Sequence, residues 1–164
     1  MKILDIFKKG NTTPTRFLQA NATSYPDKIL IETTDRVRDG FGISSVKITI
    51  LAADPDSELL GSTVRHHLKL SEDNLRTPKD LNKNYNEFLS VAGFRNGKEH
   101  HKDALQLLID QVDNVITLYP NRNGGWTGKN RGFTPVENAE IKVDANSSNS
   151  DLGESIKLGW TKCE

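Results

Sequence analysis

The histidines of this 164-residue chain come as two adjacent pairs, His66-His67 and His100-His101. Neighbouring side chains on a helix point about 100° apart, so neither pair alone presents two rings to one metal ion. One ring from each pair could converge with a carboxylate such as Asp103 to form a metal site or an acid–base site. The alternative is that His67 packs on a helix face and the other rings are solvated. The histidines therefore leave open a small metal-dependent hydrolase.

Acidic side chains are dense between residues 54 and 73. Two carboxylates can hydrolyse a glycosidic bond when an apolar pocket raises one pKa, but no apolar motif surrounds these. The simplest interpretation is that they start helices and form turns. The functional interpretation is an acidic surface that docks a basic protein, because complementary charge speeds encounter and sets specificity. The candidate binding residues are Asp54, Asp56, Glu58, Glu72 and Asp73.

The segment Asn123–Lys129 is rich in glycine and contains Trp126. It is not a phosphate-binding P-loop, because Asn130 stands where that motif needs serine or threonine. Glycines around one tryptophan favour a turning backbone whose indole closes the edge of a core. Together with Arg122, Lys129 and Arg131, the tryptophan also forms a small basic and aromatic patch on which RNA could stack.

The composition argues against several classes of protein. The 22 basic residues balance the 22 acidic ones, so the basic surplus typical of nucleic-acid binders is absent. No apolar run approaches the roughly 18 residues of a membrane span, and the five residues between Lys2 and Lys8 are too few for a secretory signal. The single cysteine, Cys163, cannot form an internal disulfide or a multi-cysteine zinc site, which favours a reducing compartment such as the cytoplasm. We expect no cofactor, no nucleic-acid partner and no membrane partner.

Sequence periodicity predicts the elements that would position these residues. Alternation predicts two antiparallel strands over 29–34 and 45–51, the second turning Val46, Ile48 and Ile50 toward the core. The other predictions are a short strand or helical turn over 1–9, a helix starting at Asp54, a helix from 77 to Gly93, a polar loop at 95–103, a hairpin over 105–118 (although 104–112 could be helical), a loop at 120–132, a strand at 138–143 and a last helix from Ser150.

These elements predict one α+β domain over residues 1–164. We expect a mostly antiparallel central sheet with about three packed helices.

The last third of the chain carries the most distinctive pattern. A strand ends in Pro120, and Gly125-Trp126-Thr127-Gly128, an acidic helix start with Leu152-Gly153, and the nearly terminal Cys163 follow. In this order the elements resemble the CdiI-type immunity proteins of bacterial contact-dependent growth inhibition (CDI) systems, over roughly residues 81–164. The resemblance implies a mixed α/β fold and a cytoplasmic protein that is not an enzyme.

The resemblance also implies a partner, which is the C-terminal toxin domain of the cognate CdiA effector, often a nuclease. Such proteins bind the toxin and neutralise it, and we expect this one to occlude the toxin's active site as a monomer or weak dimer. The Gly-Trp-x-Gly and Leu-Gly positions are interpreted as fold markers rather than toxin contacts. A nuclease groove is basic, so the five acidic residues would face it, although the chain as a whole carries no net charge.

Overall fold

The computed structural model describes residues 16–164, so the element predicted over 1–9 lies outside the described part. An antiparallel sheet in the strand order β3-β2-β1-β4-β5-β6 forms the centre, and β7 shares the outer edge of β5 with β6. Three of the four helices have 12 or more residues, which confirms the predicted α+β fold. The elements are β1 (Phe17–Ser24), β2 (Lys28–Arg36), β3 (Gly42–Ala52), α1 (Ser57–Leu70), α2 (Leu81–Ala92), α3 (Gly97–His101), β4 (Leu105–Val112), β5 (Val115–Asn123), β6 (Phe133–Pro135), β7 (Ile141–Asp144) and α4 (Asn149–Trp160).

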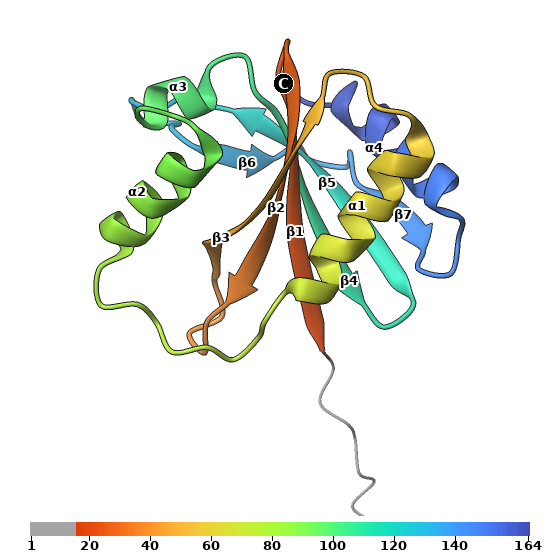
Figure 1. Ribbon diagram of the computed structural model, residues 1–164, viewed down its shortest axis with the longest axis horizontal. Coiled ribbons are helices and arrows are strands. Elements are labelled where there is room, and N and C mark those ends of the chain that lie inside the picture. Colours follow the sequence, from red (N-terminus) through yellow and green to blue (C-terminus); the bar gives the residue numbers. More distant parts are fainter. Residues whose placement is uncertain (1–15) are drawn as a thin grey trace, which may run out of the picture.

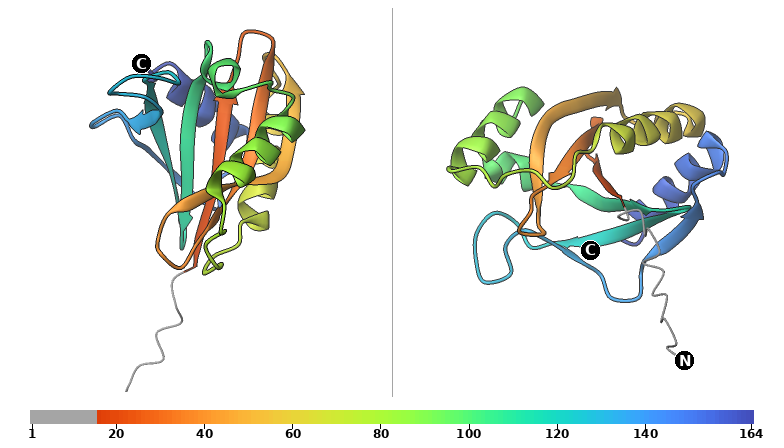
Figure 2. Two further views of the ribbon diagram at one scale, coloured as in Figure 1. Left: turned by 90° about the vertical axis from the view of Figure 1, so that its left-hand side faces the viewer. Right: turned by 90° about the horizontal axis from the view of Figure 1, so that it is seen from below.

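The sheet separates two layers of helices. Helices α1 and α4 pack on one face and α2 and α3 lie toward the other, as Figures 1 and 2 show. Side chains alternate between the faces along each strand. In β2, Ile29 and Ile31 therefore join the core beneath α1 and α4, while Leu30 joins the core beneath α2. We call the two sides the α1/α4 face and the α2/α3 face.

The α1/α4 face is closed by a continuous apolar core. Small side chains at Ala20 and Ala22 keep β1 close to the helices, and the Trp160 indole donates to the Ala22 carbonyl at 3.1 Å. Helices α1 and α4 also touch closely, because a Cβ at Gly61 or Gly153 would overlap the backbone of the other helix. The fully buried large side chains of this core are Ile29, Ile31, Leu60, Leu68, Leu107, Ile109, Ile116, Leu118, Leu152 and Ile156.

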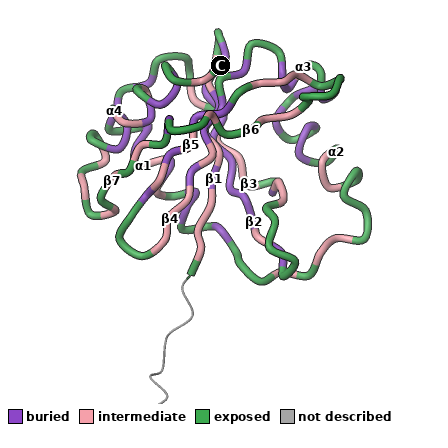
Figure 3. Tube along the Cα trace, turned by 180° about the vertical axis from the view of Figure 1, so that it is seen from behind, coloured by how far each residue is buried: buried purple, intermediate pink, exposed green. Residues whose placement is uncertain are grey.

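The core on the α2/α3 face is smaller and more aromatic. It is built from Tyr25, Leu30, Phe88, Leu89, Ala92, Phe94 and Ala104. Figure 3, coloured by burial, shows buried stretches concentrated in the sheet and on the inner sides of the helices. Part of this face remains outside the apolar core and carries polar side chains.

The helix signals in the sequence hold with corrections to where α1 and α2 begin. Helix α1 begins at Ser57, and Asp56 is its N-cap, with the carboxylate accepting from the Leu59 amide at 2.8 Å. The predicted start at Asp54 was therefore wrong, and that residue lies in a turn with φ +53°. Helix α2 begins at Leu81 with Asp80 as its N-cap, so the predicted start at 77 was too early. It ends as predicted at Gly93, whose φ of +80° suits glycine.

Two other local predictions were wrong. Residues 97–101 form the short helix α3 instead of lying in a polar loop. Of the three β3 residues predicted to face the core, Val46 and Ile50 are 54% and 49% exposed, and only Ile48 packs against it. Alternation fixes which side chains share a face, but β3 is an edge strand that the helices cover only in part.

The remaining strand predictions agree better with the structure. The hairpin of β4 and β5 confirms the strand interpretation and excludes the helical alternative for 104–112. Strand β7 confirms the strand around Ile141, whereas β1 and β6 were not predicted. No helix among residues 16–164 is long and apolar enough to cross a membrane.

Candidate polar binding site on the sheet

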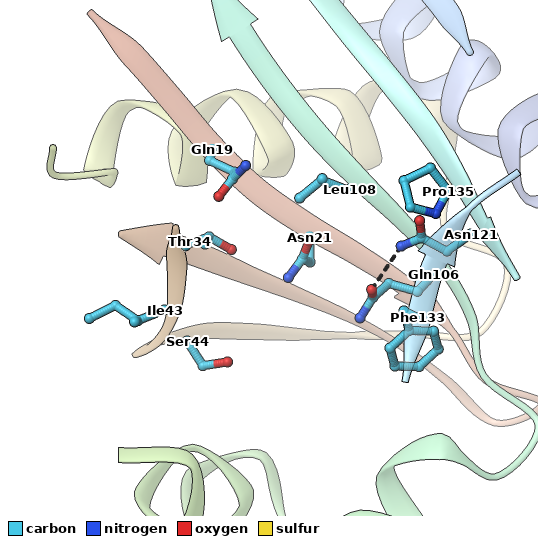
Figure 4. Close-up of a pocket in the computed structure, with 11 residues that line it drawn as sticks. Gln19, Asn21, Thr34, Ile43, Ser44, Gln106, Leu108, Asn121, Phe133 and Pro135 are labelled. Carbon is cyan, nitrogen blue, oxygen red and sulfur yellow. Dashed lines mark hydrogen bonds between the residues drawn. The ribbon is translucent and has the colours of Figure 1, made fainter. Parts of the chain in front are cut away.

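Polar side chains gather on the part of the α2/α3 face that the apolar core leaves free. They project from neighbouring strands into one cavity of about 270 Å³, closed at one end by β6 (Figure 4). We call this cavity the polar basin. Its lining residues are Gln19, Asn21, Thr34, Gly42, Ile43, Ser44, Gln106, Leu108, Asn121, Phe133 and Pro135.

The register of the sheet explains how these residues meet. On β1, Asn21 pairs with Glu32 of β2, and Gln19 lies between Thr34 of β2 and Asp110 of β4. Every second residue of a strand points to the same side, so the alanines between these polar residues enter the opposite core. The polar basin is therefore a direct result of polar residues at alternate positions on paired strands.

Hydrogen bonds inside the sheet fix the orientation of the amide groups. Glu32 Oε1 accepts from Asn21 Nδ2 at 2.7 Å, and Asp110 Oδ1 accepts from Gln19 Nε2 at 2.8 Å. An ionised carboxylate can only accept, so each amide turns its nitrogen toward the acid and its oxygen away from it. In the same way, Asn121 Nδ2 donates to Gln106 Oε1 at 3.0 Å and leaves its own oxygen free for another donor.

The acid behind the basin is buried and incompletely bonded. Glu32 is only 3% exposed, and burial raises its pKa to about 7, although the hydrogen bond from Asn21 opposes the shift. Its second oxygen, Oε2, has no hydrogen-bond partner within residues 16–164. Burial likewise raises the pKa of Asp110, against the hydrogen bond from Gln19. Buried acceptors without donors are costly, so a group of them points to a function.

The first histidine pair lies on the other side of the sheet. His67, in the last turn of α1, is buried against the sheet, where Nδ1 lies 2.9 Å from the Thr33 hydroxyl and Nε2 lies 2.8 Å from the Thr49 hydroxyl. The Thr33 hydroxyl also donates to the His67 carbonyl at 3.1 Å, which assigns the ring proton to Nδ1. Burial lowers the pKa of His67 to about 4, so this ring is neutral and structural.

The second histidine pair belongs to the α2/α3 face. His100 Nδ1 lies 2.9 Å from the Tyr85 hydroxyl, and burial lowers the His100 pKa to about 3. His101 stacks on Phe133 with a 4.6 Å centroid distance. The sheet therefore separates the two pairs, and no three His, Cys, Asp or Glu side chains in residues 16–164 are grouped to hold a metal ion. The hydrolase alternative has no assembled site in this part of the chain.

The sequence matches the CdiI family, described as CDI immunity protein, over residues 18–163. The chain belongs to the CDI immunity protein family. Its fold is similar to that of a protein of unknown function, NMB0488, from Neisseria meningitidis, with 16% identity, a TM-score of 0.77, and coverage of 91% of this chain and 96% of the other. It is also similar to a chain of the CdiA-CT/CdiI toxin and immunity complex from Yersinia pseudotuberculosis, with 16% identity, a TM-score of 0.75, and coverage of 91% and 98%. No curated protein matches the chain by sequence.

The positions that carried the resemblance have internal packing partners. Trp126 stacks on Tyr85 at 5.6 Å and lies against Gly97, where a Cβ would overlap the indole. The Leu152-Gly153 pair forms part of the contact between α1 and α4. Cys163 is half-buried with its thiol donating to the Gln106 carbonyl at 3.4 Å, and burial raises its pKa. These contacts give each position a role in the fold.

The five acidic residues predicted to bind the toxin are all exposed, and they form two groups. The 14-residue helix α1 separates these groups by about 20 Å. At its N-terminal end, Glu58 accepts from Asn149 Nδ2 at 2.8 Å and Asp54 lies 3.6 Å from Lys157 Nζ, while Asp56 caps the helix. Beyond its C-terminal end are Glu72 and Asp73.

The second acidic group is near the polar basin. The Arg36 amide, at the end of β2, donates to the Glu72 carbonyl at 2.8 Å, and Arg36 pairs in the sheet with the basin residue Gly42. The Glu72 carboxylate lies 3.4 Å from Lys47 Nζ, and Asp73 accepts from the next amide of the chain. The structure thus brings Glu72 and Asp73 together and keeps them apart from the group at Asp54.

The polar basin has no counterpart among the sites predicted from the sequence. The available signal was the alternation of alanine with amide residues over Gln19–Ala22. Polar residues at alternate positions normally face water, and only the pairing of the strands shows that these face a shared cavity.

Proposed function

We propose that this chain neutralises the C-terminal toxin domain of its cognate CdiA effector by binding it tightly in the cytoplasm, with no chemical step of its own. The observation that carries the proposal is the match to the CDI immunity family across residues 18–163. The similar fold in a CdiA-CT/CdiI toxin and immunity complex supports it. The histidines offer no competing catalytic arrangement, because the sheet separates the two pairs.

The proposal extends to the kind of toxin and the way it is blocked. We take the toxin to be a nuclease whose active site the immunity protein occludes. The phosphate-binding groove of a nuclease is basic, and exposed carboxylates complement it. Surface ion pairs such as that of Asp54 with Lys157 contribute little to stability, so these acids can exchange their internal partners for a toxin.

Co-expression with the cognate CdiA toxin domain tests the proposal. We expect the chain to rescue growth and to copurify with the toxin in a stable complex, and a CdiA toxin domain of another specificity serves as the control. Rescue without a physical complex would instead support an enzymatic antidote and contradict neutralisation by binding.

The two acidic groups can be tested separately by charge reversal. Glu58→Lys and Asp73→Lys should each slow toxin association severalfold at low salt, with a smaller effect at high salt, if both groups face a basic toxin surface. Stopped-flow association rates over a range of ionic strength measure this effect. A group whose reversal leaves both the rate and its salt dependence unchanged is outside the interface.

A further inference from the structure

We infer that the polar basin is a receptor for one cationic side chain of the toxin, and that the guanidinium group of an arginine is the occupant that fits it. This inference rests on the proposed function, because it assigns the partner's chemistry at one place on this chain. Four observations carry it: unpaired oxygens, an unpaired acid, the size of the cavity, and the glycine at its entrance.

The first observation is a group of buried oxygens that have no hydrogen-bond partner among residues 16–164. Three residues that line the basin have buried oxygens without a partner among residues 16–164, namely Asn21 Oδ1, Thr34 Oγ1 and Asn121 Oδ1. Thr34 and Asn121 are 5% and 4% exposed. Every other buried side-chain atom left without a partner in this part of the chain, including Glu32 Oε2, also lies on the α2/α3 face. A ligand that supplies several N–H groups would satisfy these oxygens.

The second observation is a buried carboxylate without a counter-charge. Glu32 forms no ion pair within the described residues, and one hydrogen bond to Asn21 connects it to the basin lining. The nearby Arg36 acts on Asp110 and packs over the Phe17 ring, 4.3 Å from its centroid. Buried charges in proteins are normally paired, and a cation bound in the basin would lie beside the Asn21 amide that connects Glu32 to the lining.

The third observation is the size and shape of the cavity. Its volume of about 270 Å³ lies just below the range of roughly 300–1,000 Å³ that suits drug-sized ligands, so it suits the end of one side chain. Neighbouring strands lie about 4.8 Å apart, which spreads the acceptors over a flat surface. A guanidinium is planar and has five donors and no acceptor, so it matches this surface better than a compact ammonium. The spare amide nitrogen of Gln106 can bond a backbone carbonyl of the same toxin segment.

The fourth observation is the glycine at the basin entrance. Gly42 does not have a positive φ, so its backbone does not require glycine. A Cβ at this position would instead overlap the end of the Gln19 side chain and the Thr34 methyl group, both of which line the basin. The glycine therefore keeps the cavity open.

The first test compares two isosteric changes that each remove one acid. In Glu32→Gln, the basin loses its counter-charge but keeps the acceptor that bonds Asn21. We expect the Kd for the cognate toxin, measured by isothermal titration calorimetry, to rise about 30-fold or more, because unpairing a buried charge at an interface costs at least about that factor. The matched control is Glu87→Gln, at an exposed position of α2. Its Kd for the toxin should stay within about twofold of the wild-type value.

The second test fills the basin from within the chain. Ser44 lines the cavity, so Ser44→Arg supplies a guanidinium that competes with the toxin. The matched control is Ser90→Arg, which adds the same side chain at an exposed position of α2 outside the basin. The Ser44→Arg variant should bind the toxin at least about tenfold more weakly, and the Ser90→Arg variant should bind like wild type. Circular dichroism and thermal unfolding confirm that each variant is folded.

The outcomes separate this inference from the function on which it rests. Failure of the wild-type chain to bind the toxin would overturn both. Normal binding by wild type together with normal binding by folded Glu32→Gln and Ser44→Arg variants would overturn the inference alone and show that the basin holds only water.

Discussion

Buried polar residues on the two faces of the sheet differ in whether they have hydrogen-bond partners. Thr33 and Thr34 are neighbours on β2 and are both buried, yet Thr33 bonds the ring and carbonyl of His67 while the Thr34 hydroxyl has no partner among residues 16–164. The histidines repeat the contrast. Both ring nitrogens of His67 have partners, whereas His100 Nε2 on the α2/α3 face has none in the same part of the chain.

The contrast distinguishes a face whose polar groups are satisfied by internal contacts from a face whose polar groups lack partners among the described residues. On the α1/α4 face, apolar side chains fill the space and the polar groups satisfy one another, which stabilises the fold. The α2/α3 face keeps several buried acceptors without donors, which costs folding free energy. Such a cost is offset only when another molecule supplies the donors, so we assign stability to one face and recognition to the other.

The largest expected effect comes from truncating adjacent leucines of β4. Leu107 is fully buried beneath α4, and Leu108 lines the polar basin and is only partly buried. Leu107→Ala should lower the free energy of unfolding by about 3–5 kcal/mol, because it removes contacts and leaves a cavity in a closed core. Leu108→Ala should cost about 1 kcal/mol or less. Urea denaturation of the two variants measures both values, and equal losses would contradict the division between the faces.

The next effect is the pH dependence that Glu32 gives to stability. Its pKa is raised by burial from 4.5 to about 7 in the folded chain, so the folded state holds the proton more tightly than the unfolded state does. The resulting penalty is absent below about pH 4.5, grows as pH rises, and is complete above about pH 7.

Glu32→Gln removes this pH-dependent penalty. The stability difference between variant and wild type should therefore shift in favour of the variant by about 3 kcal/mol between pH 4 and pH 8. Comparing the same difference at both pH values cancels any effect of the new amide that does not depend on pH. A difference that stays constant with pH would show that Glu32 is not a buried, unpaired acid.

The smallest expected effect is a difference in stability between valine variants of the two neighbouring threonines, Thr33 and Thr34. Thr33→Val leaves the Nδ1–H of His67 without its acceptor and should cost about 1–2 kcal/mol. Thr34→Val removes a hydroxyl that has no partner, so stability should stay equal or rise slightly. Thermal unfolding near pH 7 measures the difference, and a loss in Thr34→Val as large as that in Thr33→Val would mean that Thr34 is already bonded in the free protein.

The sequence predicts the α1/α4 face of this molecule better than the polar basin on the α2/α3 face. Helix α4 was expected from Leu152, Ile156 and Trp160 at four-residue spacing, and all three are buried as that pattern requires. Apolar periodicity identifies such elements because it records directly which side chains leave water. The family resemblance in the last third was confirmed over nearly the whole chain.

The polar basin could not be predicted in the same way. Asn21 and Asn121 are 100 residues apart in sequence and meet only because β1 pairs with β4 and β4 with β5. The strand β1 itself was missed, since its buried apolar residues are small alanines rather than large side chains. The pairing of strands that are distant in sequence forms this site, and local sequence patterns do not indicate which strands pair.

Nuclear magnetic resonance of the labelled chain titrated with unlabelled cognate toxin tests the central claim most directly. We predict saturation at one toxin per chain, with large shifts in the side-chain amide signals of Asn21 and Asn121 and little change in the methyl signals of Leu107 and Ile156. Saturable binding that leaves those amide signals in place while it shifts the methyl signals would contradict the account, as would the absence of binding.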